Sequence, residues 1–197
     1  LCFCLFVNRA AAQKMKEAKT LLTKQVDGIL QGAVDRDEIP GAVIAIKQNA
    51  KIIYQQSYGF SQKYDIDRKI LSSPPKMNTE TLFDMASLTK VVGTTTSIML
   101  LADRVLLRVD DPVSKYIPGF DTLPKSAVTI RHLLTHTAGL YDWYPMFYLS
   151  SKRKTTYDLI HPLPLKYPVG KQRSYSDLGF TLLGEIVEKV SGLPLDE

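Results

Sequence analysis

The stretch 85-MASLTKVVGTTTSIMLLA-102 decides how this chain is interpreted, because Lys90 is its only charged residue. Ser87 stands three positions before Lys90, and residues at i and i+3 share one face of a helix. The spacing therefore predicts that a hydroxyl and an amine meet inside an otherwise uncharged helix. Burial without a partner is costly for an ammonium and lowers its pKa, and a neutral amine beside a serine can accept its proton. The pair is a candidate nucleophile and base.

The same S-x-x-K spacing occurs twice more, in different surroundings. Residues 73–76 (SPPK) contain two prolines, which exclude a helix interior, and residues 151–154 (SKRK) form a basic run that predicts a solvated loop. Only the Ser87 copy opens a long apolar segment at helical spacing, made of Leu88, Val91, Val92, Thr95, Met99 and Ala102. Spacing alone leaves two interpretations open, a catalytic pair or a buried hydrogen bond.

This segment is long enough to approach a membrane span, but its serines and threonines make it too polar for one. We therefore predict a core helix. Gly93 and the three threonines that follow it have poor helix propensity, so packing on all sides is expected to hold the helix. A buried helix is also a rigid platform for a nucleophile.

Composition and charge indicate an ordinary globular protein. The chain has 197 residues, of which 45% are hydrophobic and 23% charged, with a net charge of +5. Its basic residues are spread along the sequence without interleaved aromatics, which argues against a nucleic-acid partner.

Residues 1–12 differ from the rest. An apolar run is followed by Asn8-Arg9 and three alanines, which predicts the remnant of a secretory signal peptide with cleavage after Ala12. The protein is then exported to the periplasm or the extracellular space, and residues 13–197 form part of a single domain. Both cysteines lie in the first segment, so the mature part is expected to have neither a disulfide nor a thiol nucleophile.

The predicted elements are one helix, two strands and then mainly helices. We expect helices at 13–37, 85–102, 129–136 and 178–190, strands at 42–46 and 52–54 joined by a turn at 48–51, a loop at 57–78, and a short helical segment at 110–118. The apolar strand 42–46 should be covered on both faces, and an isolated hairpin is marginal in water. We therefore expect a domain truncated before its C-terminal strands, inactive and poorly soluble when expressed alone.

A second constellation, 174-SYSD-177, precedes the last predicted helix. Tyr175 is either a surface residue or, if a cation lowers its pKa, a base. With these residues in place the sequence resembles the serine β-lactamase-like family, in the branch of class C β-lactamases, penicillin-binding proteins and esterases. The resemblance covers about residues 14–197 and is carried by 39-IPG-41, 87-SLTK-90, 107-LRVDDPV-113, 116-YIP-118, 129-TIRHLLTHTAGL-140, 175-YSDLGF-180 and 182-LLG-184.

The resemblance implies an α/β fold in which an antiparallel sheet is flanked by helices, with a helical subdomain. It assigns Ser87 as nucleophile, Lys90 as its activating partner and Tyr175 as the base that relays the proton, with no metal and no cofactor. The implied reaction is hydrolysis through an acyl-serine on an ester, amide or β-lactam carbonyl. The expected partner is a small-molecule or peptidoglycan-like acyl substrate, with no nucleic acid and no membrane span in the mature chain.

Two departures from the family pattern bear on this mechanism. Asp177 replaces the usual asparagine, so either its charge keeps Lys90 protonated and shifts the base role to Tyr175, or Asp177 is buried, protonated and mimics asparagine. The family's third motif, which supplies one oxyanion-hole N–H, has no candidate after Tyr175 in this sequence.

Other features have weaker functional readings. His132 and His136 have the i, i+4 spacing of metal ligands, although the resemblance implies a structural role for their helix. The aromatic stretch 141–148 either lines an acyl-binding wall or packs against the helical subdomain. We expect an esterase or a D-Ala-D-Ala peptidase-like enzyme rather than a β-lactamase; the alternatives are a binding or sensing module without turnover, or an inactive fragment.

Overall fold

The computed structural model describes residues 2–197, excluding the side chains of 2–12, 14–16 and 18–19. Two compact units, Leu1–Asp84 and Met85–Glu197, divide the chain, and each is described by itself. The predicted signal-peptide remnant has a backbone that continues the first helix, but its side chains lie outside the described residues. In the part of the chain that is described, no helix is both long and apolar enough to cross a membrane.

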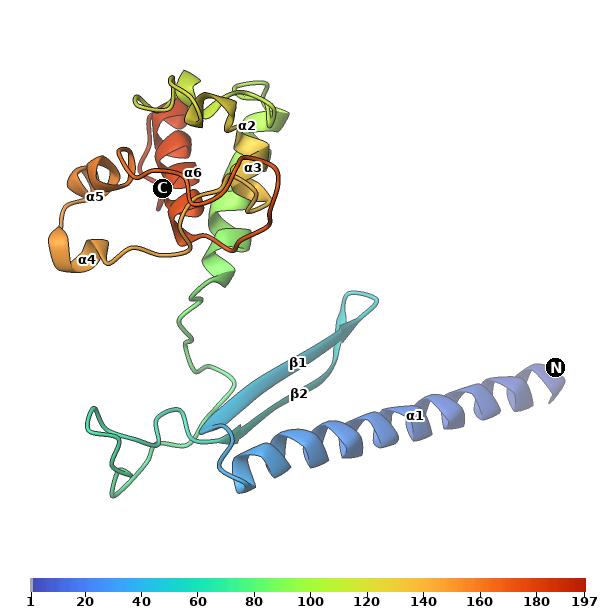
Figure 1. Ribbon diagram of the computed structural model, residues 1–197. Coiled ribbons are helices and arrows are strands. Elements are labelled where there is room, and N and C mark those ends of the chain that lie inside the picture. Colours follow the sequence, from blue (N-terminus) through green and yellow to red (C-terminus); the bar gives the residue numbers. More distant parts are fainter. Residues whose placement is uncertain (1) are drawn as a thin grey trace. The chain divides into compact units, whose positions relative to one another are not determined.

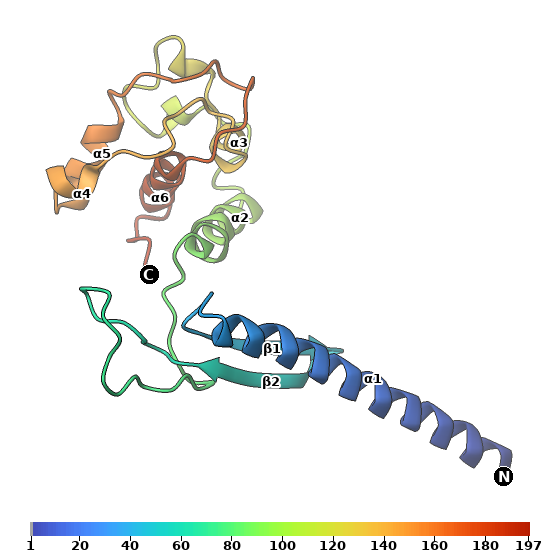
Figure 2. The ribbon, with the colours of Figure 1, turned by 60° about the horizontal axis from the view of Figure 1, so that its bottom comes forward.

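The first unit consists of a long helix beside a β-hairpin (Figures 1 and 2). Helix α1 spans Cys2–Asp35, and strands β1 (Gly41–Gln48) and β2 (Lys51–Gly59) pair antiparallel. Asn49 and Ala50 form the turn with φ values of 48° and 64°, the left-handed pair that matches the twist of a two-residue hairpin. Both strands are longer than predicted, and the hairpin itself is confirmed.

A carboxylate fastens the helix to the hairpin. Asp27 of α1 accepts hydrogen bonds from the hydroxyls of Tyr54 and Tyr58 on β2. Within this unit, β1 has no fully buried residue, so the expectation of a strand covered on both faces is not met in the described chain. The physical reason is that packing onto this hairpin comes from α1, which contacts β2.

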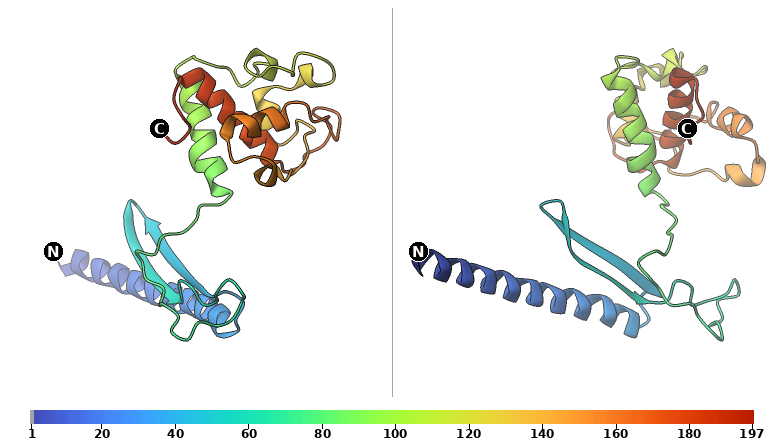
Figure 3. Two further views of the ribbon diagram at one scale, coloured as in Figure 1. Left: turned by 90° about the vertical axis from the view of Figure 1, so that its left-hand side faces the viewer. Right: turned by 180° about the vertical axis from the view of Figure 1, so that it is seen from behind.

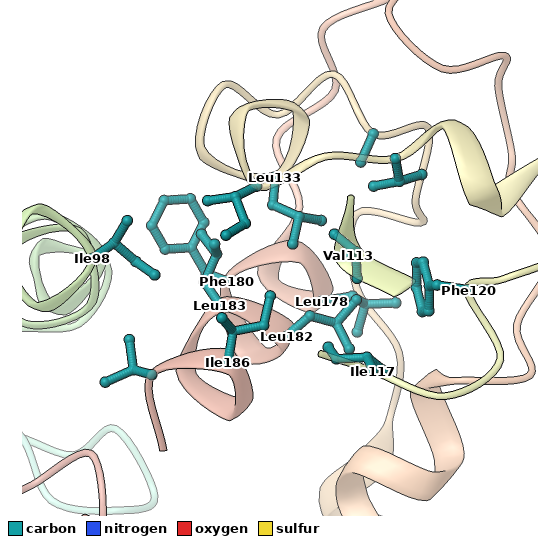
Figure 4. Close-up of a cluster of buried hydrophobic side chains, with 14 of the residues drawn as sticks. Ile98, Val113, Ile117, Phe120, Leu133, Leu178, Phe180, Leu182, Leu183 and Ile186 are labelled. Atoms are coloured by element: carbon teal, nitrogen blue, oxygen red, sulfur yellow. The ribbon is translucent and has the colours of Figure 1, made fainter. Parts of the chain in front are cut away.

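The second unit is helical and is built around its last helix. Helix α6 (Asp177–Ser191) contacts α2 (Thr96–Asp103), α3 (Ile130–Leu134) and α5 (Arg153–Ile160), and Figure 3 shows α2 and α6 side by side. Its inward side chains are fully buried (Figure 4): Leu178, Leu182, Leu183 and Ile186. Around them pack Ile98, Val113, Ile117, Phe120 and Leu133. This core holds the C-terminal half of the chain together.

Helix ends follow the capping rules that the sequence predicts. The Ser176 hydroxyl accepts from the N–H of Gly179 and caps α6, which ends at Gly192 with φ of 74°. Helix α3 begins after Thr129, whose hydroxyl accepts from the N–H of His132. A short 3₁₀ segment, Val113–Lys115, stands where a helical segment was expected at residues 110–118, and a second, Lys125–Ala127, follows outside that range.

The helix predicted for residues 85–102 has a different geometry. Lys90–Thr95 is a π-helix, η1, which continues into α2. Hydroxyls explain the wider turn: Thr95 Oγ1 donates to the carbonyl of Lys90 at 2.7 Å and Thr96 Oγ1 to that of Val91 at 3.1 Å, each five residues back. A helix with Gly93 and three threonines therefore satisfies its carbonyls in part through side chains.

Packing on all sides of this helix, as predicted, is not observed within the second unit. Thr94, Ile98 and Leu101 are buried, whereas apolar residues on other faces are exposed: Leu88, Val91, Val92, Met99 and Leu100. The reason is that the sequence is apolar around most of the helix, while α6 and its neighbours cover one side.

Two helices were not predicted. Helix α4 (Met146–Leu149) lies in the aromatic stretch, and α5 begins at Arg153, inside the basic run expected to be a loop. Tertiary contacts hold α5, because Arg153 pairs with Glu188 at 2.5 Å and Tyr157 donates to Glu188 at 3.0 Å. Residues 73–76 are not helical, as their prolines predict.

Candidate active site

Ser87 lies in the turn that leads into the η1–α2 helix. The turn is tight, since Leu88 N–H bonds the carbonyl of Met85 and Lys90 N–H bonds that of Ser87, at 2.9 and 3.1 Å. Lys90 Nζ donates to Ser87 Oγ at 3.2 Å. The meeting of hydroxyl and amine expected from the i, i+3 spacing is therefore present, on an exposed serine at a helix N-terminus.

Asp177 brings a negative charge to this pair. Its Oδ1 lies 2.7 Å from Lys90 Nζ; the contact is an ion pair rather than an aligned hydrogen bond, because that oxygen is covered and has no hydrogen-bond partner. Burial alone would lower the pKa of Lys90, but Asp177 and Tyr175 outweigh it, and the pKa is raised. Of the two alternatives stated for Asp177, this contact favours the one in which its charge keeps Lys90 protonated. The two residues lie 87 positions apart in the sequence.

Tyr175 completes the cluster from the segment before α6. The Ser87 hydroxyl and the Lys90 ammonium hydrogen-bond to its phenol and lower its pKa. Lys90 Nζ also lies 5.0 Å from the centroid of the Tyr175 ring. The structure thus gathers all four predicted site residues, Ser87, Lys90, Tyr175 and Asp177, in one place. Their geometry suits proton transfer between a hydroxyl and a phenolate that a cation stabilises.

His136 is a site residue that the sequence did not identify. Its ring lies against Tyr175, with centroids 4.6 Å apart, and against Phe180, at 5.1 Å. Its Nδ1 accepts the N–H of Ser176 at 3.0 Å. Burial first, and then the positive charges of Arg173 and Lys90, lower the pKa of His136. The available signal was the 129–140 motif, but spacing had suggested only a metal ligand.

Neither histidine is arranged with a third ligand. His132 Nδ1 faces the N–H and hydroxyl of Thr129 at 3.1 and 3.0 Å, which completes the cap of α3. Across the residues that the structure describes, no group of three or more His, Cys, Asp and Glu side chains could hold a metal ion.

Two clefts border Asp177. One, of about 310 Å³, is lined by Lys90, Thr94 and Phe180; the other, of about 400 Å³, is lined by Trp143 and Phe147 of the aromatic stretch. The packing alternative for that stretch is confirmed for two residues, and the acyl-binding wall stays a prediction. Tyr144 and Met146 pack against the core, whereas Trp143, Phe147 and Tyr148 are exposed.

A larger cleft of about 640 Å³ lies elsewhere in this unit. It is lined by Tyr157, His161, Glu185 and Glu188, and by none of the predicted catalytic residues. We therefore place the candidate active site at the Ser87 cluster, where the reactive groups converge, and not in this larger cleft.

Comparison with curated proteins finds relatives named as an amidase and a carboxypeptidase. A protein of Bacillus subtilis (strain 168) named N-acetylmuramyl-L-alanine amidase is 36% identical over 170 residues, 80% of this chain and 38% of that protein. One of Salmonella heidelberg (strain SL476), named as a D-alanyl-D-alanine carboxypeptidase, is 33% identical over 185 residues, 87% of this chain and 42% of that protein. The chain thus spans well under half the length of these curated relatives.

Solved structures and a family model confirm the predicted fold class. EstCE1, described as a hydrolase with promiscuous acyltransferase activity, superposes with a TM-score of 0.71 at 29% identity, over 90% of this chain and 49% of that one. The family model described as Beta-lactamase matches residues 26–197. Since that match covers most of the sequence, the chain belongs to the beta-lactamase family.

Proposed function

We propose that this protein is a serine hydrolase that acts through an acyl-enzyme, with Ser87 as nucleophile, Tyr175 as base and Lys90 as the cation that activates both. The observation that carries the proposal is the convergence of Ser87, Lys90 and Tyr175, with the Tyr175 pKa lowered and the Lys90 pKa raised. Those directions favour a phenolate base over an amine base. Names of relatives, which include an amidase and a carboxypeptidase, support hydrolysis in general.

The steps follow from these contacts. Ser87 Oγ attacks the substrate carbonyl carbon while the Tyr175 phenolate takes the hydroxyl proton, and Tyr175 then returns that proton to the departing group. Water next attacks the acyl-Ser87 carbonyl, gives one proton to Tyr175 and releases the acid, and Ser87 recovers its proton. Lys90 stays an ammonium throughout, with Asp177 Oδ1 at 2.7 Å from its Nζ.

Ser87 also supplies a candidate oxyanion donor. The Ser87 backbone N–H lies at the start of a helix, where developing negative charge is favoured. We propose this N–H as one half of an oxyanion hole.

We propose an ester or a peptidoglycan-like amide as substrate in preference to a β-lactam. The relatives' names support this choice, because both refer to bonds of cell-wall muropeptides or D-alanyl peptides. Export fits such a substrate, and the apolar start of the sequence supports it.

A serine-directed probe tests the proposal in the full-length protein. A fluorophosphonate should label Ser87, as mapped by peptide mass, and Ser87→Ala should lower kcat for p-nitrophenyl esters by about 10⁴–10⁶-fold. Ser73→Ala is the matched control, since Ser73 has the same spacing to a lysine in a segment whose prolines exclude a helix. Labelling of Ser73, or unchanged turnover in Ser87→Ala, would rule out the nucleophile.

Pre-steady-state kinetics separate turnover from sensing. Steady release of p-nitrophenol after the first equivalent supports an enzyme, whereas one equivalent followed by silence would identify a binding or sensing module acylated at Ser87.

A further inference from the structure

His136 forms hydrogen bonds with the residues on both sides of Tyr175. The N–H of Ser174 donates to the backbone carbonyl of His136 at 2.9 Å, and the N–H of Ser176 donates to His136 Nδ1 at 3.0 Å. Between these bonds, the imidazole lies against the Tyr175 ring at a centroid distance of 4.6 Å. One residue therefore contacts the residue before Tyr175, the residue after it and its aromatic ring.

The backbone at His136 makes this arrangement possible. Its φ is 59°, the left-handed conformation that commonly ends a helix and that, apart from glycine, asparagine, aspartate and histidine adopt most often. Residue 136 follows α3, and its N–H bonds the carbonyl of Leu133 at 3.2 Å. The left-handed turn thus places a side chain where a helix usually ends in glycine, and directs it at the Tyr175 segment.

Only one protonation state of His136 can make the bond to Ser176. Nδ1 accepts a hydrogen bond, so the imidazole is neutral with its proton on Nε2, whereas an imidazolium has two donors and no acceptor. The charged and titratable groups around the ring are Arg173, Lys90, Asp177 and Tyr175. Arg173 and Lys90 oppose a positive imidazole, and of these neighbours Asp177 alone favours it.

We infer that His136 is a positioning residue for Tyr175 and that it acts only as the neutral Nε2–H tautomer. The inference rests on the proposed function, in which Tyr175 is the base. Tyr175 is half-exposed, so packing of its own ring leaves it room to move. Protonation of His136 breaks the bond to Ser176 and releases one side of the segment, which moves the phenol away from Ser87.

Nuclear magnetic resonance of the full-length Ser87→Ala protein tests the tautomer without any turnover. Long-range proton–nitrogen spectra should show His136 neutral and protonated on Nε2 at pH 7.5, with a midpoint below the ordinary 6.5 of histidine. A proton on Nδ1, or a midpoint at or above 6.5, would overturn the inference and leave the proposed nucleophile untouched.

Two variants separate the acceptor from the ring. His136→Asn keeps an acceptor and tolerates the left-handed backbone, so its kcat/KM above pH 7.5 should fall only about threefold, and the decline that follows His136 protonation should vanish. His136→Phe keeps a ring and loses the acceptor, so kcat/KM should fall about 10–100-fold at every pH, as small misplacements of a catalytic group do.

His132→Asn is the matched control, because His132 also accepts a backbone N–H through Nδ1 but caps α3. It should leave the pH profile unchanged. Melting curves identify any variant that fails to fold, and the tautomer measurement then decides alone. The acidic limb of the wild type contains the protonation of Tyr175 and that of His136, so it should become less steep in His136→Asn. Wild-type activity in folded His136→Phe, or an acidic limb in His136→Asn as steep as in the wild type, would refute the positioning role.

Discussion

Tyr58 and Tyr175 have opposite surroundings in the two units of the chain. Tyr58 is 6% exposed and Tyr175 50% exposed. Burial raises the pKa of Tyr58, and so does its hydrogen bond to the Asp27 carboxylate at 2.5 Å. Donation from Ser87 and Lys90 lowers that of Tyr175. A tyrosine beside a carboxylate is a structural donor, whereas one beside an ammonium and a hydroxyl is prepared to accept a proton.

Tyr116 shows that the hydrogen-bond partner of a tyrosine, and not the unit in which it lies, decides the direction of its pKa shift. It lies in the second unit with Tyr175, but its hydroxyl donates to Asp111 at 2.5 Å. Burial and this carboxylate raise its pKa even though Lys115 is near. The comparison therefore predicts that only Tyr175 among these three takes part in catalysis, because it contacts an ammonium and donates to no carboxylate.

Removal of the phenol hydroxyl from Tyr175 and from Tyr58 should give the largest difference between the two residues. Tyr175→Phe should lower kcat/KM by about 10²–10⁴-fold, the usual contribution of a general base, with little change in stability. Tyr58→Phe should leave kcat/KM within about threefold but lower the free energy of unfolding by about 1 kcal/mol, the value of one hydrogen bond. Steady-state kinetics and urea unfolding measure both. Equal activity losses in the two variants would remove the distinction.

Asp177→Asn tests whether the charge of Asp177 affects the pKa values of Tyr175 and Lys90. The Asp177 carboxylate raises both the Tyr175 pKa and the Lys90 pKa, so its loss should lower both. Both limbs of the pH profile of kcat/KM should therefore move to lower pH, the acidic limb through Tyr175 and the basic limb through Lys90. A profile that superposes on the wild type would show that Asp177 does not act on the pair electrostatically.

Asp111→Asn should have the smallest effect on activity, because its effect should appear only in stability. Lys115 and Tyr116, with the N–H of Arg108, lower the pKa of Asp111 to about 2 from 3.8. A depressed carboxyl pKa stabilises the fold above pH 3.8, and this stability is lost as the pH falls towards 2. The variant should thus lose about 1–2 kcal/mol at pH 7 and almost nothing near pH 2. Urea unfolding at both pH values measures this, and an equal loss at both would contradict it.

Residue spacing could predict the local part of the site, and only the family resemblance pointed to Asp177 as a charge beside Lys90. Ser87 and Lys90 meet because a separation of three residues fixes a shared helix face. The protonation of Lys90 depends on a carboxylate from another helix, and no local pattern reports that contact. His136 was missed for the same reason, since its role depends on a left-handed backbone and on bonds to residues about 40 positions later.

The fold shows the same division. The hairpin and α6 were predicted because alternation, turn residues and caps are local signals, and the family resemblance supplied the fold class. Helix α5 was missed because eight residues that begin in a basic run have little intrinsic helicity. An ion pair with Glu188 and the buried Ile160 hold it in place.

The π-helical segment η1 also bears on chain length. A π turn holds one residue more than the corresponding α turn, and the hydroxyls of Thr95 and Thr96 support the wider ring. The wider turn accommodates the extra residue locally. The turn with Ser87 and Lys90 therefore keeps its orientation relative to the buried face of the helix at Ile98. A homologous chain with a single-residue gap between Lys90 and Thr96 could thus form an unbroken α-helix and still aim its serine and lysine in the same direction.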